Sequence, residues 1–170
     1  MNTTYRILQA VWTIESPKLF LETLRDIADR FGTRIVCFNA DSMAGEGHVR
    51  TAIRHAWRSW SSGNAISNSF EMEALLYAAG NRQCQEAAAF GIHTGYNRCY
   101  IVLCPPRDAA QSALASHVRF VDEDWEPVSA EKQEVLCRLF GISGAELAVT
   151  GHARLKELVE ERVALLDVYR

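Results

Sequence analysis

The hydrophobic positions in the first forty residues follow two different periods. The segment YRILQAVWTI (residues 5–14) is rich in β-branched and aromatic residues, which predicts a β-strand. Ser16 and Pro17 form a typical helix start, and apolar residues then recur at helical spacing until Gly32 ends the pattern. The segment TRIVCFN (residues 33–39) predicts a short buried strand. The chain therefore begins with a predicted β-α-β unit.

The remaining pattern is mostly helical. Strands are predicted at RCYIVLC (residues 98–104), before two prolines, and at the sheet edge at VRFVDEDW (residues 118–125). Asn68 and Glu71 form a predicted capping box that opens the helix EMEALLYAAG. Further helices are predicted over residues 46–60, 82–90, 108–117, 129–140 and 152–169, with ISGAELAVT (142–150) as a link. We predict an α/β fold, a single domain over residues 1–170, with a small mixed or antiparallel sheet of about four strands packed with about seven helices.

Composition adds limits to this prediction. The chain has 170 residues, of which 48% are apolar and 23% are charged, as in ordinary globular domains. No apolar run approaches the roughly 20 residues needed to span a bilayer. The N-terminal residues do not resemble a secretory signal. We therefore expect a cytoplasmic protein that does not bind membranes.

The five cysteines are an odd set without a CxxC pair or a matching histidine spacing. They lie among apolar residues, which favours small buried side chains in a reducing compartment over disulfides or a zinc site. No metal ligand set is therefore expected.

The charges are distributed unevenly. Residues 120–170 hold eleven acidic and six basic residues, whereas residues 1–119 hold twelve basic and ten acidic ones. A molecule with two oppositely charged parts can bind RNA on one side and a different partner on the other.

The helix predicted over residues 46–60 has a basic stripe beside an apolar arc. The stripe consists of Arg50, Arg54 and Arg58, spaced by four residues, with His48 and His55 extending the polar side. Such a row fits a phosphate backbone, because each guanidinium can bind phosphate oxygens in pairs. A solvated helix face is the alternative interpretation.

The junction AAGNRQC is a second candidate. Gly80 allows a sharp turn, so a helix starting near Asn81–Gln83 would expose unpaired N–H groups beside Arg82. Such a corner attracts a phosphate or a terminal hydroxyl-bearing group. The alternative interpretation is a corner between two helices with Asn81 as an ordinary cap.

No catalytic constellation is evident. The histidines are dispersed, no GxSxG segment is present, and GEG at residues 45–47 is too short for a phosphate loop. An alternative hypothesis is a small-molecule α/β enzyme in which Asp41, His48 and Arg82 converge on a pocket. We expect no catalytic residues and no cofactor.

The last predicted helix has an unusually wide apolar surface. Such a helix either closes the core or offers a second face to another protein. The apolar residues are Leu155, Leu158, Val159, Val163, Ala164, Leu165, Leu166, Val168 and Tyr169.

Three segments together resemble the smallest subunit of the KEOPS complex, the Cgi/TPRKB (PRPK-binding protein) family. These segments are FNADSMAGEGHVRTAIRHAW, NSFEMEALLYAAGNRQ and the ending EERVALLDV, which is similar to archaeal members. The resemblance implies a non-catalytic adaptor that supports threonylcarbamoyladenosine modification of tRNA. Its implied partners are the 3′ CCA end of tRNA, the kinase-like ATPase of the complex and, indirectly, the threonylcarbamoyl transferase. The remaining alternative is a purely structural kinase-binding subunit without RNA contact.

The resemblance also implies specific residues. The site for the CCA end is expected at His48, Asn68, Ser69, Phe70, Arg82, Gln83, Gly91 and Ile92, with Arg50, Arg54 and Arg58 along the acceptor strand. The kinase is expected to bind Leu158, Val159, Val163, Leu165 and Leu166.

Overall fold

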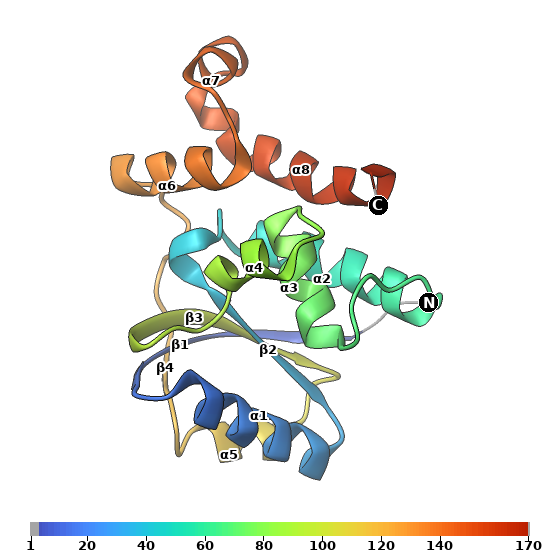
Figure 1. Cartoon of the computed structure of the whole chain (residues 1–170). Helices are drawn as coiled ribbons and strands as arrows, with labels where there is room; N and C mark the ends of the chain where they lie inside the picture. The colour runs from blue at the N-terminus through green and yellow to red at the C-terminus, as the bar shows by residue number, and fades with distance from the viewer. Residues whose placement is uncertain (1–3, 170) are drawn as a thin grey trace. The chain divides into compact units, whose positions relative to one another are not determined.

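A computed structural model describes residues 4–169, and their contacts group into two compact units. The sheet unit comprises the described residues up to Asn39 together with Gly91–Glu123, and the helical unit comprises Ala40–Phe90 and the described residues from Asp124 onward. Each unit is thus built from two separate stretches of chain (Figure 1). The prediction of one domain over residues 1–170 stays a prediction.

The sheet unit contains a four-stranded antiparallel sheet and two helices. The strand order is β2-β3-β1-β4. The elements are β1 (Arg6–Ile14), α1 (Pro17–Phe31), β2 (Arg34–Asn39), β3 (Gly95–Cys104), α5 (Asp108–Leu114) and β4 (Arg119–Val121). The α/β class and the antiparallel sheet are confirmed. Because β3 pairs with both β1 and β2, it lies between the two strands of the predicted β-α-β unit.

Local signals explain the ends of α1. The Ser16 side chain accepts a hydrogen bond from the Leu19 amide at 3.3 Å, and Pro17 occupies the first turn. Gly32 ends the helix in the left-handed conformation, with φ 65°.

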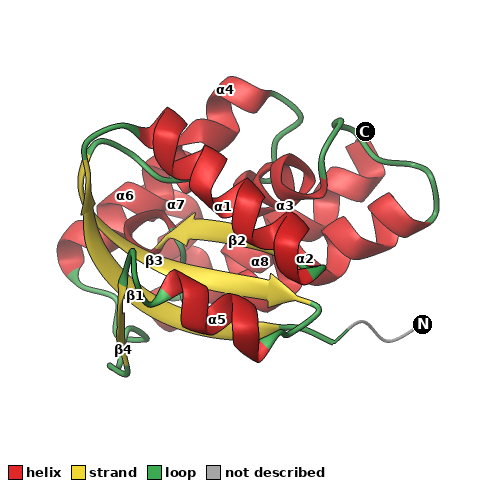
Figure 2. Ribbon diagram, turned by 90° about the horizontal axis from the view of Figure 1, so that it is seen from below, coloured by secondary structure: helices red, strands yellow, loops and turns green. Residues whose placement is uncertain are grey.

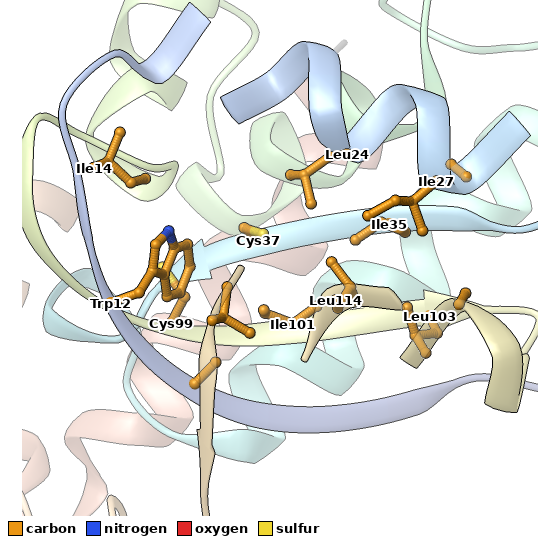
Figure 3. Close-up of a cluster of buried hydrophobic side chains, with 14 residues drawn as sticks. Trp12, Ile14, Leu24, Ile27, Ile35, Cys37, Cys99, Ile101, Leu103 and Leu114 are labelled. Atoms are coloured by element: carbon orange, nitrogen blue, oxygen red, sulfur yellow. The ribbon is translucent and has the colours of Figure 1, made fainter. Parts of the chain in front are cut away.

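One face of the sheet and the two helices form a hydrophobic core. In Figure 3, Leu24 and Ile27 of α1 lie over Ile35 and Cys37 of β2. Helix α5 packs against α1 and adds Leu114 to the same cluster (Figure 2). The alternating apolar positions of the strands therefore meet the apolar stripes of two helices.

The helical unit contains six α-helices and three 3₁₀ turns among its described residues. They are η1 (Ala40–Ser42), α2 (Glu46–Ser61), α3 (Phe70–Ala79), α4 (Cys84–Ala87), η2 (Ala88–Phe90), α6 (Ala130–Phe140), α7 (Gly144–Thr150), η3 (His152–Arg154) and α8 (Leu155–Tyr169). Helix α8 packs against α2, α3 and α6. Helix α7 lies in the segment predicted as a link, so that prediction is wrong; Ser143 caps it by accepting a hydrogen bond from the Glu146 amide.

Gly80 permits the close approach of α3 and α8. It ends α3 with φ 60°, and a Cβ atom there would lie 3.0 Å from the carbonyl oxygen of Arg162. Glycine is therefore needed for both the backbone conformation and the packing.

Within the described part of the chain, no helix is both long and apolar enough to cross a bilayer.

The cysteines differ in burial. Cys37, Cys99 and Cys104 are buried, Cys137 is half-buried and Cys84 is exposed, so the prediction that all five are buried is wrong. Burial raises the pKa of the Cys37 thiol to about 12, which keeps it protonated.

Candidate nucleic-acid interface

The exposed face of α2 is a row of arginines. Arg50, Arg54 and Arg58 are exposed, which confirms the predicted stripe. The predicted apolar arc lies in the core, where Val49 and Ile53 are completely buried. The four-residue spacing places the guanidinium groups along one line of the helix.

The three arginines differ in their partners. Arg50 forms an ion pair with Glu46 one turn earlier. The guanidinium groups of Arg54 and Arg58 make no hydrogen bond or ion pair within residues 4–169. Arg54 and Arg58 are therefore the members of the stripe that are open to an external anion.

His48 is part of the core of the helical unit. It is 1% exposed, its Nδ1 accepts a hydrogen bond from the Ala44 amide at 3.0 Å, and its Nε2 lies 2.8 Å from the Ala78 carbonyl oxygen. Burial, together with the positive charge of Lys132, lowers the pKa of His48 to about 4, although the Ala78 hydrogen bond opposes this shift. The imidazole is thus neutral and fully engaged, and the predicted contact of His48 with RNA is incompatible with this position.

Phe70 is also buried. Its ring is 1% exposed and packs edge-on against Trp57 with centroids 5.8 Å apart. Stacking on an unpaired base requires an accessible ring face, so the predicted role of Phe70 does not fit. Phe70 is the first residue of a mostly apolar helix, so the sequence pattern is equally consistent with core packing.

The neighbouring polar residues are arranged differently from the predicted capping box. Ser69, rather than Asn68, caps α3 by accepting a hydrogen bond from the Met72 amide at 3.1 Å. Asn68 is exposed and available for external contacts, while Ser69 is half-buried. Glu73 is completely buried, and its carboxylate accepts the Ile66 amide at 2.7 Å, which fixes the loop before α3.

The corner after Gly80 is less regular than predicted. Helix α4 begins at Cys84 and has only four residues, so its dipole and its set of free N–H groups are small. The Asn81 side chain already accepts the Gln83 amide at 2.9 Å. The side chains of Arg82 and Gln83 are exposed, and they, rather than the helix start, offer polar groups to a ligand.

Gly91 and Ile92 belong to the other unit. Both lie in the sheet unit, where Gly91 is buried and Ile92 packs against the hydrophobic core. The structure therefore does not group them with the predicted site residues of the helical unit.

The predicted kinase-binding residues mostly form the core. Leu158, Val159, Val163 and Leu166 are buried, and only Leu165 is half-buried. The wide apolar stripe of α8 is explained by packing against three helices instead of one. The assignment of these four residues to a partner surface is corrected accordingly.

Acidic residues of α8 lie beside the arginine stripe. A groove of about 500 Å³ runs between α2 and α8. Its lining includes Arg50 and Arg54 from α2 and Glu157, Glu160 and Glu161 from α8. Residues from the two oppositely charged segments of the sequence thus share one surface here, so the separation onto different sides that the composition permits does not hold for them.

His55, which lines the same groove, forms a histidine–carboxylate pair that the sequence pattern did not reveal. His55 Nδ1 is 2.7 Å from Asp167 Oδ2, and the Tyr77 hydroxyl donates to Asp167 Oδ1. The His55 ring stacks on Tyr77 with centroids 5.6 Å apart. His55 and Asp167 are 112 positions apart, so only the packing of α8 on α2 brings them together.

The predicted enzyme constellation is not supported by these positions. Asp41 is exposed in η1, but both ring nitrogens of His48 are occupied by backbone groups. Within residues 4–169, no group of three or more histidine, cysteine, aspartate or glutamate side chains is arranged to hold a metal ion.

Neither protein-family models nor curated proteins match this chain.

Proposed function

We propose that this protein is a non-catalytic, RNA-binding adaptor of the KEOPS type, which holds the 3′ CCA end of tRNA and binds a kinase-like ATPase. The proposal rests on the resemblance of three sequence segments to the Cgi/TPRKB family. The structural observation that supports it is the exposed arginine stripe of α2, in which Arg54 and Arg58 lack partners among the described residues. In this proposal the protein acts in the cytoplasm and reaches the threonylcarbamoyl transferase only indirectly.

The RNA contact is proposed to depend most on Arg58 and Arg82. Both are exposed, and Arg58 does not line the groove that contains the acids of α8. Arg50 and Arg54 line this groove, where nearby carboxylates oppose a phosphate. Arg82 can bind phosphate or stack its guanidinium plane on an unpaired base, with Gln83 and Asn68 reading polar edges.

The kinase contact is proposed for the outward side of α8. Leu165 is half-buried, Ala164 is exposed, and Val168 is 69% exposed. These residues replace the four buried ones as the candidate partner surface. Leu165→Glu is expected to abolish capture of the kinase in a pull-down while leaving tRNA binding intact. Insolubility of this variant would mean that Leu165 belongs to the core and would contradict the assignment.

A gel shift with two RNAs tests the RNA contact. The wild-type protein is expected to bind intact tRNA and to bind tRNA without its CCA end more weakly. Equal affinity for both would contradict the 3′-end proposal. No binding to either RNA would favour the alternative of a purely structural kinase-binding subunit.

Charge-reversal variants locate the contact. Arg82→Glu is expected to weaken tRNA binding and to leave kinase binding unchanged. Arg25→Glu is the control, because Arg25 is also an exposed arginine but lies on α1 in the sheet unit. Equal losses for both variants would indicate a non-specific charge effect instead of a site.

A further inference from the structure

The groove between α2 and α8 has walls of opposite charge. Arg50 and Arg54 come from α2, and the three acids come from α8. The remaining lining consists of Gly47, Thr51, His55 and Ala164. A volume of about 500 Å³ is in the range of small-molecule sites, which is roughly 300–1,000 Å³.

Some of these charged side chains already have partners and others do not. Arg50 pairs with Glu46, Glu157 pairs with Arg154, and Glu160 accepts a hydrogen bond from Thr51 at 3.3 Å. By contrast, Arg54 and Glu161 have no ion pair or hydrogen bond through their side chains within residues 4–169. A cation and an anion thus line the same groove without neutralising each other.

His55 adds a directed polar group to the groove. A carboxylate only accepts hydrogen bonds, so its contact with Asp167 places the proton of the neutral imidazole on Nδ1. Tyr77 fixes the pair from the other side by stacking on the ring and donating to Asp167. His55 Nε2 makes no hydrogen bond within the described residues and is not among their fully buried unpaired atoms, so it remains available in the groove that His55 lines.

We propose that this groove binds a small zwitterion, an α-amino acid or a short peptide with free termini. The carboxylate of the ligand binds Arg54, its ammonium group binds Glu161, and His55 Nε2 hydrogen-bonds to the ligand. A simple anion would meet the acids of α8, and a simple cation would meet the arginines of α2, so each is disfavoured by one wall. The inference goes beyond the proposed RNA contact and does not depend on it.

NMR titration of the full-length wild-type protein at pH 7 and low salt tests the proposal. The ligands are L-alanine, L-alanyl-L-alanine, N-acetyl-L-alanine and L-alaninamide, and the readout is the ring signals of His55. One or both zwitterions are expected to cause a saturable shift, with the acetylated and amidated compounds binding at least about tenfold more weakly because each lacks one charge. Tighter binding of alanine than of the dipeptide assigns the groove to free amino acids, and the reverse order assigns it to peptides.

Two outcomes of this titration would overturn the proposal. One is the absence of a saturable shift with both zwitterions. The other is equal or tighter binding of the acetylated or the amidated compound. Both use the unmodified protein and so do not depend on the folding of any variant.

Variants of exposed residues define the contacts. Arg54→Gln and Glu161→Gln are each expected to weaken binding of the preferred zwitterion by about tenfold. Arg58→Gln is the matched control, because Arg58 is exposed on the same helix but does not line the groove. The affinity of this variant for the zwitterion is expected to stay unchanged. Equal effects of Arg54→Gln and Arg58→Gln would place the ligand outside the groove. Since Arg58 is central to the RNA contact, loss of tRNA binding in Arg58→Gln with retained amino-acid binding would separate the two proposals.

Discussion

Helices α2 and α8 have similar sequence patterns and both bury their apolar side, but the partners of that side could be predicted only for α2. Both have an apolar stripe beside a charged one. In α2 the predicted division is confirmed, with the arginines outside and Val49 and Ile53 in the core. For α8 the pattern leaves core closure and a partner surface open, and the family resemblance implies a kinase-binding role, yet Val159 and Val163 are completely buried. The charged stripe of a helix therefore predicts its exposed side well, whereas the width of an apolar stripe does not show what covers it.

The largest effect on stability is expected from a pair of substitutions on α8. Val159→Asp places a carboxyl group in the core and is expected to destabilise the protein by more than about 3 kcal/mol, whereas Val168→Asp changes the exposed side and is expected to cost less than about 0.5 kcal/mol. Urea unfolding followed by circular dichroism measures both values. Similar costs for the two variants would contradict the burial of Val159.

His48 provides a pH test of the inner side of α2. Its pKa is about 4 in the folded protein and 6.5 in its ordinary state, so the unfolded chain binds more protons between these values. The contribution of neutral His48 to the free energy of unfolding is fully present above pH 6.5 and is lost as the pH falls to about 4. The total loss is about 3 kcal/mol.

The measurement is urea unfolding at several pH values between 4 and 7. His48→Gln is expected to flatten the dependence, because glutamine does not titrate. His117→Gln is the control, since His117 is exposed. If the free energy of unfolding of His48→Gln fell with pH as steeply as that of the wild-type protein, groups other than His48 would cause the loss of stability.

The outer side of α2 is tested by RNA affinity. Under the proposed function, Arg58→Glu is expected to weaken tRNA binding about tenfold, and Arg54→Glu only about twofold, because acids of α8 lie near Arg54. Filter binding at two salt concentrations measures the difference. An equal loss in both variants would mean that the acidic wall has no influence on the neighbouring arginines.

The smallest expected effect concerns the hydrogen bond between α3 and α8. Tyr77→Phe removes the hydroxyl that donates to Asp167, and a cost of about 1 kcal/mol is expected in urea unfolding. The ring and its stacking on His55 are retained. A cost near zero would show that solvent replaces this contact fully.

Local signals made much of the fold predictable. Ser16, Pro17 and Gly32 set the ends of α1, and short runs rich in apolar, β-branched and aromatic residues indicated the strands. Helix α7 was missed because its sequence, GAELAVT, is short and contains β-branched residues, although Ser143 and Glu146 have the spacing of a capping box. The antiparallel pairing of β1 with β3 joins residues far apart in the chain, which periodicity does not specify.

The candidate site was less predictable. The exposure of Arg54 and Arg58 follows from helical spacing, but the burial of His48 and Phe70 depends on what packs over them. The proximity of His55 to Asp167 depends on the tertiary contact of two helices from opposite parts of the chain. Such information is absent from any local pattern.

The helical unit is built from two separate stretches of chain, which affects how it folds during synthesis. Helix α8 supplies buried residues to the core of this unit, and it is translated after α2, α3 and α6 have been made. The whole second stretch of the sheet unit is synthesised between α4 and α6. During translation, apolar residues of α2 that α8 covers in the folded protein therefore stay exposed until α8 has been synthesised. This exposed apolar surface is expected to bind chaperones that protect nascent chains.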